Sequence, residues 1–170
     1  MRILKKLLIA VAAVILVVTL AIVVAGFFVP AERSFANEID INAPADKVWQ
    51  VLTDKKRYTE WQTRLERVEI TDDQHWIEYP KDAPEPLSFR LENDSRPSSM
   101  EFSYTMGTAI NGHWKGEIAP TASGVRLRTI DSCKTNSWLM KIMLAAFFDL
   151  DSFAKDWNEK LKQRVETLDR

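Results

Sequence analysis

Two histidines are the side chains of this sequence most suited to proton transfer at neutral pH. His75 and His113 could serve as a general acid or base, because an unperturbed histidine side chain titrates near pH 6.5. His113 alternates with Trp114 in a strand-like stretch, so we expect it on the outer face, exposed to solvent. His75 lies at a turn beside Trp76, and we expect it at the surface as well.

Glu78 is the carboxylate best placed to take part in ligand binding or catalysis. It lies in the segment Trp76-Ile77-Glu78-Tyr79, where either Trp76 and Glu78 or Ile77 and Tyr79 face inward. Alternation alone leaves both orientations open. An inward Glu78 would have a raised pKa and could bind a ligand hydroxyl or act as a base, whereas an outward Glu78 is an ordinary solvated residue.

Tyr104 lies on the strand face that we assign to the interior, together with Met100, Phe102 and Met106. An inward tyrosine either satisfies its hydroxyl within the core or presents it to a ligand. Both roles are open at this point.

Soft metal ligands are scarce. Cys133 follows Asp131 near the end of the last strand, with no neighbouring histidine to activate it, so we expect an inert thiol. One cysteine excludes a disulfide framework, and one cysteine with two histidines is too few for a zinc site. We expect neither a metal nor a cofactor.

Aromatic and methionine side chains are the largest apolar resource of the chain. They either pack a solid core or line a cavity that stays partly open to a hydrophobic ligand. We take the second interpretation as the working hypothesis. The candidate ligand-binding residues are Phe89, Phe102, Tyr104, Met106, Trp114, Phe153 and Trp157, with Glu78.

Composition limits the class of protein. The chain has 170 residues, with 23 Lys+Arg against 24 Asp+Glu, and that length fits one domain plus an appendage. Low Gly and Pro contents exclude collagen-like and low-complexity chains. A net charge of −1 gives no electrostatic basis for a nucleic-acid partner, so we expect none.

The N-terminus predicts a membrane anchor. Leu7 to Val29 is an uninterrupted uncharged run, which as a helix would span roughly 34 Å, slightly more than the ~30 Å hydrocarbon core of a bilayer. Arg2, Lys5 and Lys6 precede this run. Cations on this flank predict a single-pass protein with a cytoplasmic N-terminus and an extracytoplasmic (periplasmic) domain.

A cleaved signal peptide is the alternative interpretation. Val23-Val24-Ala25 and Val29-Pro30-Ala31 loosely fit cleavage patterns, but the run exceeds the roughly 7–15 apolar residues of a signal core. We therefore divide the chain into an anchor, 1–30, and an exported domain, 31–170. Because the first strand begins near Ser34, the domain should stay within ~20 Å of the headgroups.

The exported part alternates between two periods. Residues 34–41 predict a strand, and 45–54 and 55–65 predict two short helices. From Val68 to Leu127 the period of two predicts about six antiparallel strands with one buried face. Residues 137–170 predict a long helix with a bend or a restart near 149–152. We expect this helix to cover a curved sheet of six or seven strands, an α+β helix-grip fold.

Several segments carry a family resemblance. Residues 39–62 (IDINAPADKVWQVLTDKKRYTEWQ) resemble the opening of the START-related SRPBCC superfamily, which includes polyketide cyclase/dehydrase-like domains and the birch-pollen allergen. Gly112-His113-Trp114 with Pro120 and Gly124, and residues 161–166 (LKQRVE), resemble its late hairpin and closing helix. The resemblance spans about 34–168 and implies the fold, whereas for function it leaves lipid carriers, cyclases and binding modules open, because the superfamily includes all three. No catalytic signature of an enzyme branch is present, so no active site is carried over.

Three functions follow from these patterns. The first is an anchored domain that binds a lipid, quinone or polyketide-like molecule between its sheet and its C-terminal helix. The second is a cyclase- or dehydratase-type enzyme, which requires Glu78 or His75 to face the cavity. The third is an interaction module with a filled core and an envelope protein as partner. We expect binding rather than catalysis.

Overall fold

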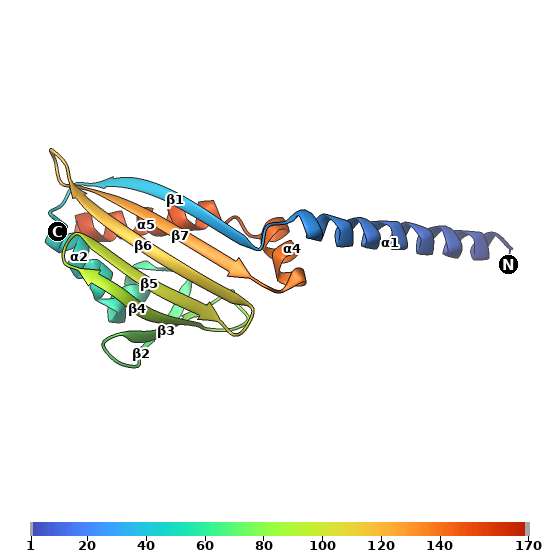
Figure 1. The fold of residues 1–170 in the computed structure, drawn as a ribbon, viewed down its shortest axis with the longest axis horizontal. Coiled ribbons are helices and arrows are strands. Elements are labelled where there is room, and N and C mark those ends of the chain that lie inside the picture. The colour runs from blue at the N-terminus through green and yellow to red at the C-terminus, as the bar shows by residue number, and fades with distance from the viewer. Residues whose placement is uncertain (1, 169–170) are drawn as a thin grey trace.

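An apolar helix, α1 (Arg2–Phe28), projects from one end of a curved sheet in the computed structural model, which describes residues 2–168 (Figure 1). Within those residues, α1 alone is long and apolar enough to cross a membrane, and a signal sequence near the N-terminus meets the same criteria. The predicted run from Leu7 to Val29 therefore forms a helix that ends one residue earlier. Positions 169–170 of the predicted C-terminal helix lie outside the described residues.

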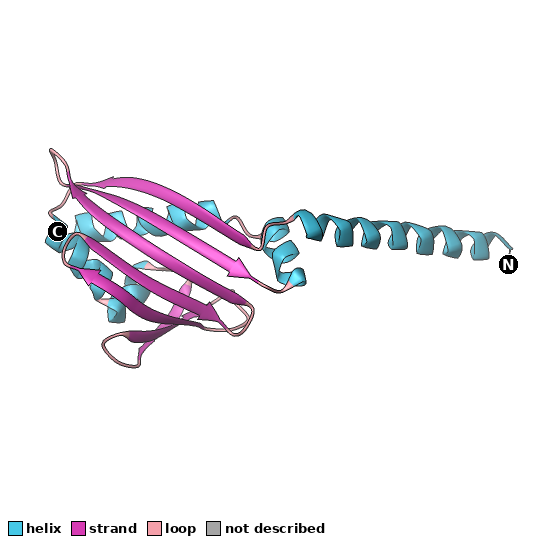
Figure 2. Ribbon diagram, viewed as in Figure 1, coloured by secondary structure: helices cyan, strands magenta, loops and turns pink. Residues whose placement is uncertain are grey.

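Seven antiparallel strands form one sheet, as the alternation predicted, in the order β1-β7-β6-β5-β4-β3-β2 (Figure 2). The strands are β1 (Glu32–Ile41), β2 (Leu65–Ile70), β3 (His75–Pro80), β4 (Leu87–Ser95), β5 (Ser99–Met106), β6 (Ile110–Pro120) and β7 (Val125–Thr135). β1 begins at Glu32, two residues before the predicted start. Arg33 consequently belongs to the strand, on the same face as half-buried Ile39 and buried Ile41.

The connection between β1 and β2 is less helical than predicted. Helix α2 (Ala45–Thr53) matches the expectation, but residues 55–65 form only a 3₁₀ turn, η1 (Lys55–Arg57), and one helical turn, α3 (Tyr58–Trp61), before β2 starts at Leu65. Buried Tyr58 fixes the start of α3 against α2, because its hydroxyl donates to the Leu52 carbonyl oxygen (2.6 Å).

The C-terminal block is two helices, so of the two alternatives that the sequence left open, the helix restarts rather than bends. α4 (Trp138–Phe147) and α5 (Leu150–Thr167) are separated at Phe148 and Asp149, within and just before the predicted bend. Asp149 caps α5, because its carboxylate accepts the Ser152 backbone N–H (3.0 Å). Only α5 packs across the inner face of the sheet, whereas α4 turns toward α1 (Figure 1).

The core lies between the sheet, α2 and α5. Leu161 and Val165 of α5 and Leu127 of β7 are completely buried there. A buried hydrogen bond from the Asn158 amide to the Thr129 hydroxyl (2.8 Å) fixes the helix over β7. The sheet and α5 together form the helix-grip arrangement that the sequence predicted.

Candidate functional site

Aromatic side chains form a continuous row across the inner face of the sheet. Trp76 stacks on Phe89 with ring centroids 5.0 Å apart, and Phe102 stacks on Trp114 at 4.6 Å. Edge contacts of Phe102 with both Trp76 and Phe89 join these two pairs. Trp157 of α5 closes the row from the helix side, 5.8 Å from Trp114. Such contacts are individually favourable by about 0.5–1.5 kcal/mol, so the row rigidifies this part of the interior.

Most of the predicted ligand-binding residues belong to this row or touch it. The structure brings together Phe89, Phe102, Tyr104, Trp114 and Trp157, with Glu78 beside Trp76. Two others lie elsewhere: Met106 is half-buried at the end of β5, and Phe153 packs on Phe148 at the start of α5. The rings contact one another. They therefore leave little room, above the centre of the sheet, in the space between sheet and α5 that we expected to be open.

A half-buried tyrosine–aspartate pair lies at one end of the row. The Tyr104 hydroxyl of β5 donates to Asp131 Oδ1 of β7 (2.9 Å), across the intervening strand β6. Gly112 is the β6 residue opposite Tyr104, and a Cβ there would overlap the Tyr104 ring. The glycine therefore gives the ring the path that it needs to reach Asp131.

Burial sets the acidity of this pair. It raises the pKa of Asp131 to about 6, although the donated tyrosine hydrogen bond works against the shift. Burial and the nearby carboxylate raise the pKa of the Tyr104 hydroxyl far above neutrality, so it remains a hydrogen-bond donor. Asp131 is thus a carboxyl group that gains or loses a proton close to neutral pH.

A small pocket adjoins the pair, between the sheet and the C-terminal helices. Its volume is about 10 Å³, and its lining residues are Pro30, Ala31, Arg33, Cys133, Thr135, Lys141, Leu144 and Leu150. Arg33 Nη1 is buried without a hydrogen-bond partner in the protein. Burial and the nearby Asp131 raise the pKa of the Cys133 thiol to about 11, which agrees with the inert thiol that we expected.

Glu78 faces inward, which decides between the two orientations left open by the sequence. It shares a face of β3 with buried Trp76, whose indole N–H donates to Glu78 Oε1 (3.0 Å). Burial raises the pKa of Glu78 to about 7, against the opposing effects of that hydrogen bond and of Lys55. The Lys55 ammonium lies 4.4 Å from the Trp76 ring centroid, and burial lowers its pKa.

Both histidines are on the outer surface. His75 Nδ1 lies 2.9 Å from Asp72 Oδ1 at the turn before β3. His113 lies on the outer face of β6, with its Nε2 3.7 Å from Glu101 Oε2. Neither side chain reaches the aromatic row, so of the two residues that the enzyme hypothesis required, only Glu78 points inside.

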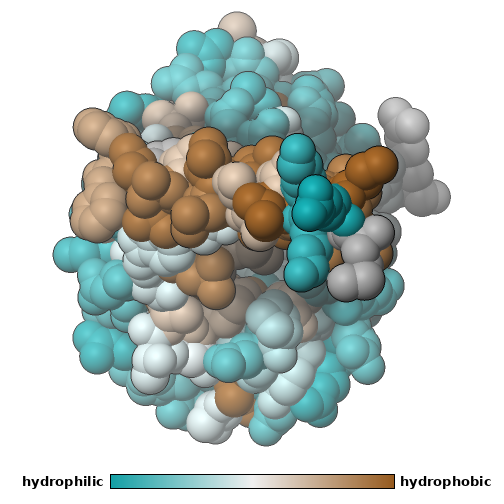
Figure 3. Space-filling model, turned by 90° about the vertical axis from the view of Figure 1, so that its right-hand side faces the viewer, coloured by the Kyte–Doolittle hydropathy of each residue, from teal (hydrophilic) through white to brown (hydrophobic). Residues whose placement is uncertain are grey.

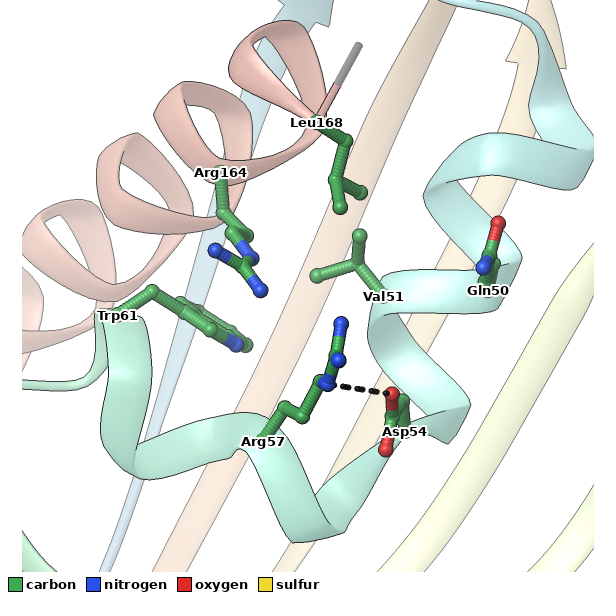
Figure 4. Close-up of a pocket in the computed structure, with 7 residues that line it drawn as sticks. All are labelled: Gln50, Val51, Asp54, Arg57, Trp61, Arg164 and Leu168. Carbon is green, nitrogen blue, oxygen red and sulfur yellow. Dashed lines mark ion pairs between the residues drawn. The ribbon is translucent and has the colours of Figure 1, made fainter. Parts of the chain in front are cut away.

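A second pocket lies at the other end of the globular part, between α2, α3 and the last turn of α5 (Figure 4). Its volume is about 20 Å³, and Arg57 and Arg164 extend toward it. Both cations already have acidic partners: Arg57 pairs with Asp54, and Arg164 pairs with Glu60. Since its charges are mutually satisfied, this pocket is a weaker candidate for a ligand site.

Metal binding has no support in residues 2–168, where no three His, Cys, Asp or Glu side chains gather as possible ligands. The polar groups that the inner face does gather are hydrogen-bond donors and two carboxyl groups. They suit an organic ligand with oxygen functions better than a metal ion.

Sequence reasoning missed Arg33, Asp131 and the pocket residues of α4. Asp131 was detectable, because Val125, Leu127, Thr129 and Asp131 follow one period-two series that leads inward. Arg33 was hidden by placing the strand start at residue 34. The pocket residues Lys141 and Leu144 depend on the turn between α4 and α5, which no periodicity indicates.

A family model for "polyketide cyclase / dehydrase and lipid transport" matches residues 32–168. The chain belongs to this family. The match begins at the first residue of β1 and ends at Leu168, the residue after α5, so it covers the whole sheet and its covering helices. No curated protein matches the chain by sequence.

Solved structures share the fold of this polyketide cyclase/dehydrase family member at low sequence identity. The ZhuI aromatase/cyclase from Streptomyces sp. R1128 has a TM-score of 0.66 at 18% identity, covering 82% of this chain and 96% of its own. Norcoclaurine synthase from Thalictrum flavum has 0.65 at 12%, covering 82% and 97%. A Mesorhizobium loti protein has 0.62 at 16%, covering 79% and 97%. At these identities the likeness establishes the helix-grip fold alone.

Proposed function

We propose that this protein is a membrane-tethered receptor for a hydrophobic small molecule that carries an oxygen-containing polar group. The observation that carries the proposal is the inner face of the sheet, where a row of aromatic rings ends at Tyr104 and Asp131, and where Arg33 lines the nearby pocket together with Cys133. An apolar wall with a few polar groups at one end is typical of sites for amphiphilic ligands. The family's description, which includes lipid transport, supports the same class of ligand.

Arg33 is the group best suited to receive the polar end of the ligand. Its Nη1 nitrogen has no partner in the protein, and a buried donor left without one costs about 1–3 kcal/mol. A carbonyl, carboxylate or phosphate oxygen in the adjoining pocket would satisfy it. Lys141, which lines the same pocket from α4, adds a second positive charge.

Entry of such a ligand requires movement of α4. The pocket of about 10 Å³ is close to the minimum for one water molecule, far below the volume of a lipid. None of the α4 side chains is fully buried, and the helix is joined to α5 through the short break at Phe148 and Asp149. Swinging α4 away from the sheet would expose the pocket and the end of the aromatic row while α5 stays in place.

The test is extraction of the bound compound from full-length protein purified in a mild detergent. Leu150→Trp fills the pocket, whereas Ser123→Trp adds the same side chain at the exposed turn between β6 and β7. We expect one hydrophobic compound to co-purify with the wild type and S123W and to be lost from L150W. Lipids that surround α1 should be present to the same extent in all three extracts. The proposal is contradicted if the extract of L150W contains the same compounds as those of the wild type and S123W.

A second candidate is an enzyme of the cyclase or dehydratase type. The inward carboxyl groups favour it, because pKa values of about 6 for Asp131 and about 7 for Glu78 suit proton transfer at neutral pH. In D2O, an enzyme that abstracts a proton next to a carbonyl would introduce deuterium into the co-purified compound. We expect Asp131→Asn or Glu78→Gln to abolish that incorporation, and a wild type that introduces no deuterium would exclude this proton-abstracting candidate.

A further inference from the structure

Helix α4 presents an entirely apolar face to solvent. Its exposed residues are Trp138, Leu139, Met143, Ala145, Ala146 and Phe147. Lys141, its charged residue, is half-buried and lines the pocket on the side of the sheet. A surface helix of a globular protein normally turns its polar side outward, so this reversed pattern marks a surface that contacts something other than water.

The end of α1 continues this surface. A Cβ on Gly26 would overlap the indole of Trp138 and approach Ile142, so α4 packs directly on the last turns of α1. Phe27 and Phe28 are 76% and 83% exposed beside it. Seen from the α1 end, hydrophobic side chains gather in a band across this face of the molecule (Figure 3). We call the exposed residues of α4, with Phe27, Phe28 and Phe148, the α4 apolar surface.

The length of α1 places this surface at the edge of a bilayer. A helix needs about 20 residues to cross the hydrocarbon core, and counting from Leu7, the first residue of the uncharged run, reaches Gly26. The contact between Gly26 and Trp138 therefore lies where hydrocarbon meets the headgroups, the level at which tryptophan is enriched in membrane proteins. Phe27, Phe28 and α4 lie at the same level.

We infer that α4 is an interfacial helix, whose apolar surface lies in the outer interface of the bilayer that α1 crosses. This inference rests on the anchoring part of the proposed function. Residues 138–148 contain no acidic side chain, so anionic headgroups meet no repulsion along the surface. The first acidic residue after it, Asp149, caps α5 where the chain turns back toward the sheet.

This position gives the ligand a route that avoids water. Lys141 and Leu144 of α4 line the pocket on the sheet side, while Leu139 and Met143 of the same helix face the lipid. A helix that lies between lipid and pocket admits a hydrophobic molecule directly from the membrane when it moves. The ligand class implied is therefore a molecule that is resident in the bilayer.

Depth-dependent fluorescence quenching of the full-length chain tests the inference. In a Cys133→Ala background, Leu139→Cys, Met143→Cys and Phe147→Cys each carry a nitrobenzoxadiazole label in vesicles of phosphatidylcholine and phosphatidylglycerol. Matched labels at Ile15→Cys and Ala122→Cys report the centre of α1 and the exposed turn between β6 and β7. These α4 positions are exposed, and near-UV circular dichroism verifies that each variant keeps its fold.

We expect the three α4 labels to lose most of their fluorescence with lipids that carry a doxyl group near the headgroup. The Ile15 label should respond more to doxyl groups deep in the chains, and the Ala122 label to neither. If the α4 labels behave like Ala122 while Ile15 is quenched, the inference is wrong although the anchor stands. Labels that are shielded from water but not quenched by lipid would assign the surface to a protein partner or a second copy. An unquenched Ile15 label would overturn anchor and inference together, without affecting the result of ligand extraction.

Discussion

Two inward carboxyl groups, Asp131 and Glu78, give the inner face its chemical character at the scale of single residues. Each is held near a neutral pKa mainly by burial, and each accepts one hydrogen bond from an aromatic side chain. A buried group of this kind costs stability in its charged form, which makes both residues candidates for a role beyond packing. In the proposed receptor, that role is contact with the polar part of the ligand.

Glu78→Gln should remove a component of the pH dependence of stability. The folded-state pKa of about 7 lies above the ordinary value of 4.5, so the folded protein holds this proton more tightly, and stability falls as pH rises from about 5 to about 7. We expect the wild type to lose about 2 kcal/mol of unfolding free energy over this interval relative to E78Q. Urea unfolding followed by near-UV circular dichroism measures the difference.

The control for this prediction is Glu117→Gln. Glu117 is a strand glutamate whose pKa is lowered by Lys115, so its titration is complete at lower pH. E117Q should therefore keep the pH dependence of the wild type. Parallel stability curves for the wild type and E78Q between pH 5 and 7 would show that Glu78 is solvated rather than buried.

Tyr104→Phe should raise the pKa of Asp131 above its wild-type value of about 6. The substitution removes the hydroxyl that stabilises the charged carboxylate, at an expected cost of about 1 kcal/mol of unfolding free energy at pH 7. The ¹³C chemical shift of the Asp131 carboxyl carbon, followed against pH, measures the change. Tyr79→Phe is the matched control, because the Tyr79 hydroxyl bonds Glu69 on the exposed face (3.1 Å). An unchanged Asp131 titration in Y104F would contradict the pairing.

At the scale of elements, the neighbouring strands β5, β6 and β7 hold the tyrosine–aspartate pair as a unit. β6 supplies only a glycine at the crossing point, so the pair depends on the register between β5 and β6 as much as on its own side chains. A shift of one residue in that register would turn Tyr104 to the other face of the sheet.

Gly112→Ala should therefore disrupt the pair without changing either of its members. The added methyl group overlaps the Tyr104 ring, and we expect a loss of about 1–3 kcal/mol of unfolding free energy together with the loss of ligand. The double variant G112A/Y104A should be destabilised less than the sum of the two single variants. Asn111→Ala, at an exposed neighbouring position of β6, is the control that should have little effect. Strict additivity would show that ring and glycine are not in contact.

Elements with strong periodicity were predictable, and the features that depend on contacts between elements were not. Alternation from residue 68 onward predicted the sheet because each strand has one buried face. The orientation of Glu78 was undecidable, since both Trp76 with Glu78 and Ile77 with Tyr79 make a plausible inner face. The sequence left a bend and a restart open near Asp149, because apolar residues recur at helical intervals on both sides of it, and the structure has the restart that separates α4 from α5. Ring contacts that narrow the interior depend on side-chain conformations, which no pattern of residue types specifies.

At the scale of the whole molecule, α1, α4 and the pocket lie at the same end of the sheet (Figure 1). The globular part is thus oriented with its candidate entrance toward α1. The pocket between α2, α3 and α5 lies at the opposite end. Because the pocket and α1 lie at the same end, a receptor for bilayer-resident molecules would benefit from keeping its N-terminal helix instead of releasing the domain.

The mature protein should accordingly retain α1. We expect the intact mass of the C-terminally tagged, membrane-extracted chain to equal that of the full sequence, with the tag accessible to protease from outside. Replacing Arg2, Lys5 and Lys6 by glutamine should reduce the fraction with an external tag, because the positive flank sets the orientation. Arg126→Gln, on the outer face of β7, is the control and should not alter it. A mass that corresponds to a chain starting after Ala25 or Ala31 would identify a cleaved signal sequence instead.

The brevity of the link between α1 and β1 limits where cargo can be delivered. Only Val29, Pro30 and Ala31 separate the two elements, and this linker spans about 10 Å when it is extended. A domain held to its membrane by so short a linker cannot reach a second membrane. A ligand that the proposed receptor removes from its own leaflet must therefore be transferred at the surface of the same membrane. The expected recipient is another protein that diffuses in or along that membrane.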